Sequence, residues 1–93
     1  MTEITIEAYI IKWAGKYVLV PKNDRGVLKA LVNKKVMLTV ISDIGVYMIE
    51  TAISENPQYG AMAILPRRMR PTWERLHEKT LKVVIEVNSN GDC

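Results

Sequence analysis

The stretch from residue 63 to residue 87, AILPRRMRPTWERLHEKTLKVVIEV, decides the fold of this chain. It opens with three apolar residues that predict a strand, and Pro66 ends this strand because proline has no N–H to donate to a sheet. A short helix is expected over residues 71–79, with Pro71 in the first turn, where no N–H partner is needed. Over residues 81–87 apolar side chains recur at every second position, which is typical of a strand with one buried face. The stretch therefore predicts strand, helix and strand in succession.

The same design occurs 45 residues earlier in the chain. When the sequence is shifted by this distance without a gap, Pro21 falls on Pro66 and Arg25 falls on Arg70. Four of the compared positions are identical, so the match rests on apolar, proline and basic classes that fall in register together. This pattern indicates two copies of one strand–strand–helix–strand unit.

Two such units are expected to form one domain of residues 1–93, since a chain of this length can bury only one core. The predicted division is a first copy over about residues 1–45, a second over about 46–88 and a tail at 89–93. In the first copy the strands are expected at residues 4–13, 17–20 and 36–41, and the helix is expected from Asn23 or Asp24 to about Asn33. The second copy is expected to begin with a strand at residues 46–53 and a polar loop at 54–58.

A single unit of this kind leaves strand edges and one apolar face open, and pairing with a copy removes both liabilities. The predicted fold is therefore mainly β: a small six-stranded, pseudo-twofold β-barrel of two strand–strand–helix–strand repeats with two short helices.

Composition agrees with a small β-rich core, because 48% of the residues are hydrophobic and none is phenylalanine. Cys93 is the single cysteine, so an internal disulfide and a thiolate metal cluster are excluded. The first residues lack the basic and apolar regions of a signal peptide, and no apolar run approaches the ~20 residues of a membrane helix. We expect a cytoplasmic protein with no membrane partner.

The net charge of +3 is small, but the basic residues are concentrated. Residues 66–75 contain four arginines against Glu74 alone, and the equivalent stretch of the first copy contains Lys22, Arg25 and Lys29. Phosphate backbones attract lysine and arginine through charge and counterion release, and arginine adds two-pronged hydrogen bonding. Both clusters also follow a strand and open a helix, where free N–H groups favour anions.

The segment LVPKNDRGVL at residues 19–28 resembles the strand–proline–helix signature of SpoVT/AbrB-type regulators, and ILPRRMR at residues 64–70 is similar to it. That family belongs to the cradle-loop barrels, with swapped-hairpin, double-psi and RIFT members. A fused pair in one chain is more similar to the double-psi barrel of AAA-ATPase N-terminal domains or to a RIFT barrel. The chain departs from the family at the Gly-Asp pair before the third strand, which here is Asn33-Lys34 and Glu78-Lys79. The glycine-to-proline spacing is also one residue longer than in an AbrB-type hairpin.

The resemblance implies that basic residues at the strand-to-helix junction contact DNA, a role that falls on Lys22, Arg25, Arg67 and Arg70. With the neighbouring residues of the second cluster, the candidate nucleic-acid-binding residues are Lys22, Arg25, Arg67, Arg68, Arg70, Trp73 and Arg75. Trp73 could stack on a base or simply cover the end of the barrel. The alternative for the arginines is a solvated rim that pairs with Glu74 and Glu78.

Other conspicuous residues have ordinary structural explanations. Trp13 is expected to pack at a hairpin tip, and His77 has no partner at metal-ligand spacing. The expected core or interface residues are Tyr47, Met48, Met62 and Met69, and the expected exposed carboxylates are Glu7, Glu50 and Glu86.

No phosphate loop, nucleophile elbow or catalytic triad is present, so we predict no catalytic residue, cofactor or metal. Three functions stay open at this stage. The first is a small, regulatory DNA- or RNA-binding protein, the second is a protein-interaction module, and the third is a minimal barrel enzyme. The chain is expected to be a monomer, or a homodimer through exposed Met37, Ile41 and Val84.

Overall fold

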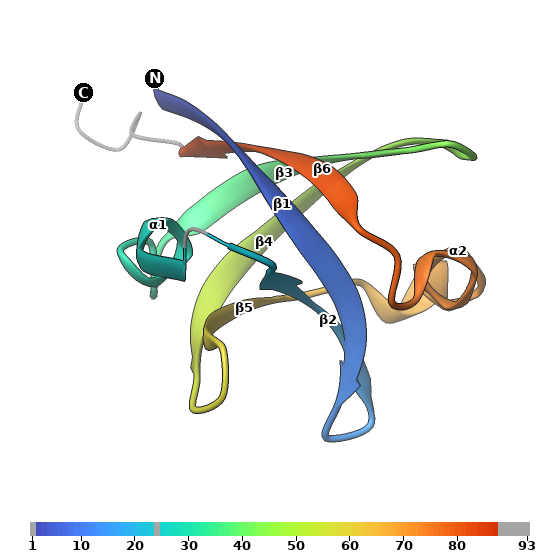
Figure 1. Cartoon of the computed structure of the whole chain (residues 1–93), viewed down its shortest axis with the longest axis horizontal. Coiled ribbons are helices and arrows are strands. Elements are labelled where there is room, and N and C mark those ends of the chain that lie inside the picture. The colour runs from blue at the N-terminus through green and yellow to red at the C-terminus, as the bar shows by residue number, and fades with distance from the viewer. Residues whose placement is uncertain (1, 24, 88–93) are drawn as a thin grey trace.

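The computed structural model describes residues 2–23 and 25–87 and contains a closed barrel of six strands (Figure 1). The strands are β1 (Thr2–Trp13), β2 (Lys16–Pro21), β3 (Lys35–Ser42), β4 (Gly45–Asn56), β5 (Gly60–Ile64) and β6 (Leu81–Val87). Around the barrel they follow the order β1-β2-β5-β4-β3-β6, and every neighbouring pair is antiparallel. The prediction of a mainly β, six-stranded barrel is confirmed, while the predicted tail at 89–93 lies outside the described residues.

The barrel interior is filled by the alternating apolar residues that the sequence predicted. Ile6, Ala8 and Ile10 of β1 are buried, as every second residue of a strand must be when one face points inward. The same alternation buries the apolar residues of β3 and β6, namely Val36, Leu38, Val40, Leu81, Val83 and Ile85. The core therefore follows directly from the period-two pattern.

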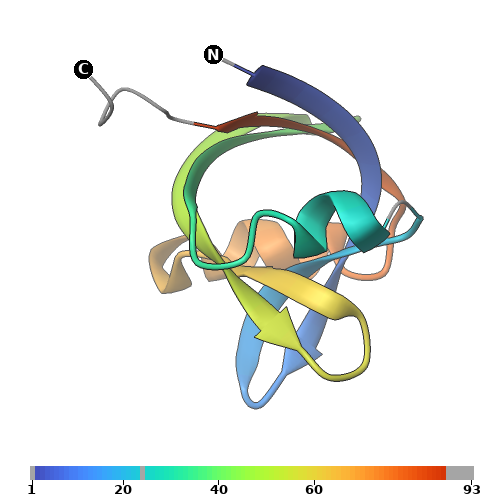
Figure 2. The ribbon, with the colours of Figure 1, turned by 90° about the vertical axis from the view of Figure 1, so that its left-hand side faces the viewer.

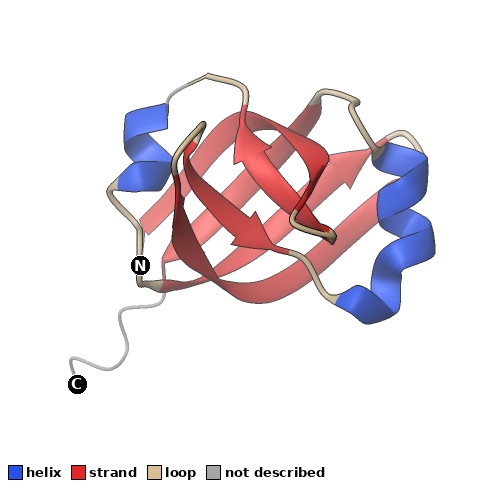
Figure 3. Cartoon of the chain, turned by 90° about the horizontal axis from the view of Figure 1, so that it is seen from below, coloured by secondary structure: helices blue, strands red, loops and turns tan. Residues whose placement is uncertain are grey.

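The two helices lie at opposite ends of the barrel, as Figures 1 and 3 both show. They are α1 (Arg25–Lys29) and α2 (Arg70–Leu76), and a 3-10 turn, η1 (Arg67–Met69), leads into α2. Figure 2, viewed from the side of α1, shows α1 in front of the curved strands and α2 behind them.

Both helices end earlier than predicted, because the following backbone bonds to a strand of the other half. The Asn33 N–H donates to the carbonyl oxygen of Ile53 at 2.8 Å, and the Glu78 N–H donates to that of Ile10 at 2.9 Å. Short parallel bridges accompany these bonds, between Val32 and Ile53 and between Ile10 and His77. A backbone N–H that bonds across the barrel is not available to continue a helix.

Strand β4 is longer than predicted, since residues 54–56 extend it instead of forming a loop. Asn56 is only 3% exposed, and its side-chain oxygen accepts hydrogen bonds from the backbone N–H groups of Gln58 and Tyr59, both at 2.8 Å. This Asx-type arrangement tightens the β4–β5 turn. It explains why a polar residue belongs to the strand.

The strand order stays the same when β1, β2 and β3 are exchanged with β4, β5 and β6. In the β2–β5 ladder Val18 pairs with Ile64 and Leu19 pairs with Ala63, so the 45-residue shift converts one pair into the other. The first strands depart from this shift, because Ile10 and Ile53 occupy matching bridges and are 43 residues apart. The 45-residue shift thus matches positions from β2 onward but not in the first strands.

The two departures from the family pattern fall on matching backbone positions. Asn33 has a φ of 73° and Glu78 a φ of 66°, and both directly follow the residues that bridge to the other half. A left-handed conformation favours glycine, so both residues adopt a backbone conformation that costs less for a glycine.

Candidate nucleic-acid interface

The seven candidate residues fall into two groups at opposite ends of the barrel. Lys22 follows β2 and Arg25 is the first residue of α1, whereas the other five belong to η1 and α2. Because α1 and α2 lie far apart in Figure 3, the structure does not bring all seven residues to one surface. Each end is therefore described by itself.

At the α2 end, the basic side chains meet the β1–β2 hairpin. The guanidinium carbon of Arg70 lies 5.9 Å from the centre of the Tyr17 ring, and Lys12 Nζ lies 5.4 Å from the same ring. Such distances are within the range of cation–π attraction. The hairpin thus adds its lysines to the arginines of η1 and α2, and we call the resulting set the α2 basic cluster: Lys12, Lys16, Arg67, Arg68, Arg70 and Arg75.

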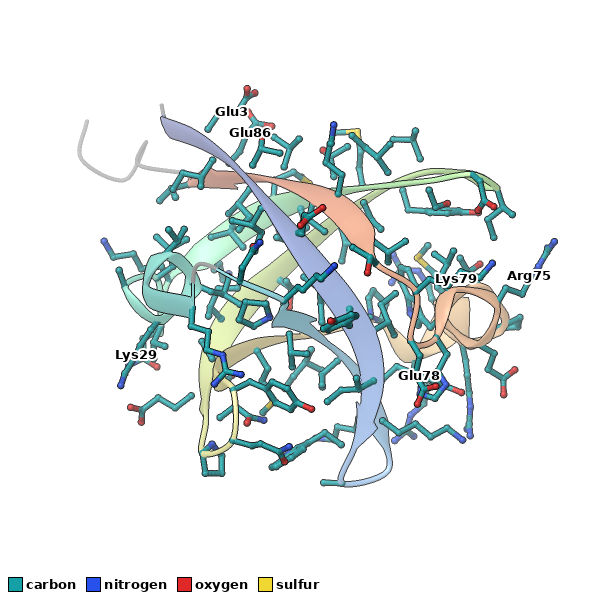
Figure 4. The ribbon with its side chains drawn as sticks, viewed as in Figure 1. Glu3, Lys29, Arg75, Glu78, Lys79 and Glu86 are labelled. Carbon is teal, nitrogen blue, oxygen red and sulfur yellow. The ribbon has the colours of Figure 1, made fainter. Side chains whose placement is uncertain are left out.

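All six members of this cluster are exposed to solvent. Figure 4 shows Arg75 extending outward from α2, away from the barrel. Lys12 and Lys16 were missed by the sequence reasoning, because only closure of the barrel places the β1–β2 hairpin against α2. Their one signal in the sequence was that they flank the tight turn at Ala14 and Gly15.

Trp73 is a correction to the predicted interface. Its side chain is fully buried, its indole N–H donates to the Pro66 carbonyl oxygen at 2.9 Å, and its ring meets Tyr47 edge-on at 6.1 Å. A ring enclosed in this way cannot stack on a nucleic-acid base. Trp73 instead closes the end of the barrel, which was the alternative stated for it.

A pocket of about 200 Å³ opens beside the α2 basic cluster. The β1–β2 turn, the end of β5 and the start of α2 surround it, and its lining residues are Gly15, Lys16, Tyr17, Ile64, Leu65, Pro66, Arg67, Arg70 and Trp73. Three of these nine residues carry a positive charge and none carries a negative charge. The pocket is thus suited to an anion.

At the α1 end, the basic residues lie among carboxylates. The Lys22 N–H donates to the backbone carbonyl of Glu7 at 2.9 Å, and the amide of Asn23 donates to the Glu7 carboxylate at 3.3 Å. Arg25 lies over the Tyr59 ring, with its guanidinium carbon 5.8 Å from the ring centre. The opening at this end includes Glu55 in its lining, so its charge is mixed.

The remaining aromatic residues have structural positions. Trp13 is half-buried and meets Tyr59 edge-on at 6.5 Å, so the tips of the two hairpins pack together as the packing prediction for Trp13 required. The His77 ring is half-buried and lies edge-on to Tyr17 at 5.9 Å. Within residues 2–23 and 25–87, no group of three His, Cys, Asp or Glu side chains could hold a metal ion.

Of the residues expected in the core or at an interface, three are at least half-buried and one is exposed. Tyr47 and Met69 pack against the core, and Met62 is half-buried. Met48 is 66% exposed, so a core position is wrong for it. The carboxylates Glu7 and Glu50 are exposed as expected, whereas Glu86 is half-buried.

Met48 belongs to an apolar outer face on strands β3 and β4. Val46 is 61% exposed beside it, and Ile41, which pairs with Val46 across the ladder, is also exposed. Met37 and Val84, which were expected to be exposed, are half-buried. A shallow groove of about 260 Å³ borders this face, lined by Lys35, Val36, Met37, Met48, Glu50, Glu86 and Val87.

No helix among the described residues combines the length and apolar character needed to cross a membrane. No protein-family model, no curated protein and no solved structure significantly matches this chain.

Proposed function

We propose that this chain is a small nucleic-acid-binding protein whose main contact surface is the α2 basic cluster. Two observations carry the proposal: Lys12 and Arg70 both lie over the Tyr17 ring, and Lys16, Arg67 and Arg70 line one pocket beside it. The lysines and the arginines come from segments far apart in the sequence. Like charges repel one another, so a fold that gathers them is suited to an anionic partner. A phosphate backbone is such a partner, and it rewards several cations at once.

In this proposal the arginines and lysines contact phosphates rather than base edges. Contacts to phosphate position a protein on the strand without reading its sequence. Lys22 and Arg25 supply a second, weaker contact at the α1 end, where Glu7 and Glu55 oppose an anion. The proposal assigns no catalytic step.

The same proposal includes kinship with the cradle-loop barrels through an internal duplication. Its support is the strand order, which is unchanged when the two halves are exchanged, and the matching bridges after both helices. A regulatory role follows from the same kinship and is part of the proposal.

The test is a salt titration of binding to a fluorescein-labelled single-stranded and a duplex oligonucleotide, followed by fluorescence anisotropy. Each phosphate contact contributes about 0.7 to 0.9 to the slope of log K against log salt. The double variant Lys12→Ala with Arg68→Ala is expected to lower that slope by about 1.4 to 1.8. The matched control removes the same charge from the sheet surface, at Lys35 and Lys82. A flat salt dependence of the unmodified protein would overturn the proposal.

A second candidate function, self-association as a protein-interaction module, is favoured by the apolar outer face. Val46 and Met48 are large apolar side chains that are more than half exposed. The groove beside them is lined by one positively charged residue, Lys35, and by two negatively charged residues, Glu50 and Glu86. A surface with both charges is self-complementary in a twofold dimer, where each contact occurs twice.

A further inference from the structure

The pocket between the β1–β2 turn and α2 has walls fixed by backbone hydrogen bonds. The Leu65 N–H donates to the Tyr17 carbonyl at 3.1 Å, which ties the end of β5 to the hairpin. The Pro66 carbonyl accepts from the Trp73 indole at 2.9 Å and from the Met69 N–H at 3.2 Å, which ties β5 to α2. A pocket whose walls are held in this way is formed before any ligand enters.

The lining residues divide by chemistry into two sets. Ile64, Leu65 and Pro66 supply apolar surface, and Lys16, Arg67 and Arg70 supply positive charge. Ligands that match both sets have a flat, weakly polar body and a compact anionic group. Arginine's planar fork suits phosphate because two N–H groups can bond two of its oxygens.

The size of the pocket limits the ligand to one small unit. Its volume of about 200 Å³ lies below the ~300–1,000 Å³ of pockets that enclose drug-sized molecules. One nucleotide, with part of it open to solvent, fits that limit, whereas a dinucleotide exceeds it. The opening at the α1 end has both Lys29 and Glu55 in its lining. Of these two openings, only the pocket beside α2 has charged lining residues that are all positive.

We propose that this pocket holds a single nucleoside monophosphate, with the phosphate on Arg67, Arg70 and Lys16 and the base against Ile64 and Leu65. The inference deepens the proposed function and rests on it. Two kinds of ligand present a nucleoside monophosphate to the pocket: a free mononucleotide, and the terminal nucleotide of a 5′-phosphorylated strand.

The test is a titration of 15N-labelled protein with adenosine 5′-monophosphate, followed through the indole N–H signals of the two tryptophans. Trp73 lines the pocket and Trp13 does not, so the Trp73 signal is expected to shift while the Trp13 signal stays. Adenosine without the phosphate, and the variant Arg67→Ala with Arg70→Ala, are each expected to bind about 10-fold or more weakly. The control is Lys82→Ala, which removes one exposed positive charge from β6 outside the pocket, with affinity expected within about 2-fold of the parent.

Two oligonucleotides that differ only in a 5′-phosphate or a 5′-hydroxyl separate the two sources. Tighter binding of the phosphorylated strand assigns the pocket to a strand end, and equal binding assigns it to the free nucleotide. No shift of the Trp73 signal at about 5 mM nucleotide, or equal affinity in the Arg67/Arg70 variant, overturns the inference. If the protein binds oligonucleotides in a salt-dependent way but binds no mononucleotide, only the inference about the pocket is overturned. If it binds the mononucleotide but no oligonucleotide, only the proposed function is overturned.

Discussion

The guanidinium of Arg70 lies over the ring of Tyr17, 5.9 Å from its centre, and the two residues come from different halves of the chain. A matching contact occurs at the other end of the barrel, where Arg25 lies 5.8 Å from the centre of the Tyr59 ring. In both cases the first residue of a helix meets the hairpin of the other half. These contacts hold each helix against a hairpin and set the position of the basic residues.

The Arg70–Tyr17 contact is expected to stabilise the fold measurably. In a double-mutant cycle with Arg70→Ala and Tyr17→Leu, we expect a coupling free energy of about 0.5–1 kcal/mol from cation–π attraction. Urea unfolding followed by circular dichroism measures it. The control cycle pairs Tyr17→Leu with Arg75→Ala and should give coupling near zero; a coupling no larger than that of the control would contradict the prediction.

Trp73 is expected to be the more important tryptophan for stability. Trp73→Phe removes the hydrogen bond to the Pro66 carbonyl and leaves a space in the core, so the free energy of unfolding should fall by about 1–3 kcal/mol. Trp13→Phe, at a half-buried hairpin tip, should change it by about 0.5 kcal/mol. Chemical unfolding of both variants provides the comparison, and equal losses would show that Trp73 does not close the barrel end in solution.

Replacement of Glu78 by glycine is expected to stabilise the fold, whereas glycine substitutions usually destabilise it. Its φ of 66° strains a side chain with a Cβ, so Glu78→Gly should raise the free energy of unfolding by about 0.5–1 kcal/mol. Asn33→Gly should raise it by only a few tenths, because asparagine tolerates this conformation better.

The control for this prediction is Glu74→Gly, within α2, which should lower the stability by about 1 kcal/mol. Thermal unfolding distinguishes the two signs. A Glu78→Gly protein that melts below the parent would contradict a left-handed backbone at this position.

The apolar outer face is expected to mediate self-association. Sedimentation velocity over a range of protein concentrations should show a dimer that Met48→Lys disperses, because a charge on the apolar face opposes burial. The substitution should alter folding stability by about 0.5 kcal/mol or less, since Met48 is 66% exposed. Lys82→Ala, on a neighbouring strand, serves as the control. A monomer at every concentration would remove the second candidate function.

The core and the positions of the strands could be predicted from the sequence because they depend on short-range periodicity. The apolar residues Ile6, Ala8 and Ile10 recur at every second position, which indicates that one face of β1 points inward. The same spacing identifies the core residues of β3 and β6. The ends of the helices could not be predicted in this way, since the bonds that end them join Asn33 to Ile53 and Glu78 to Ile10.

The candidate site was only partly predictable for the same reason. The arginines of η1 and α2 were visible as a cluster in the sequence, but Lys12 and Lys16 join them only through closure of the barrel. The burial of Trp73 depends on Tyr47 and Pro66, neither of which its local sequence identifies as a neighbour. A residue's type is evident from the sequence, whereas its neighbours across the barrel are not.

The β3–β4 turn at Asp43 and Ile44 is the sole covalent link between the two halves, yet four of the six ladders join them: β1–β6, β2–β5, β3–β4 and β3–β6. A chain cut at this turn would lose the connection but keep every hydrogen bond that interlocks the halves. Two separately expressed fragments are therefore expected to find each other and reconstitute the folded protein, so that either half can be labelled, replaced or varied independently of its companion.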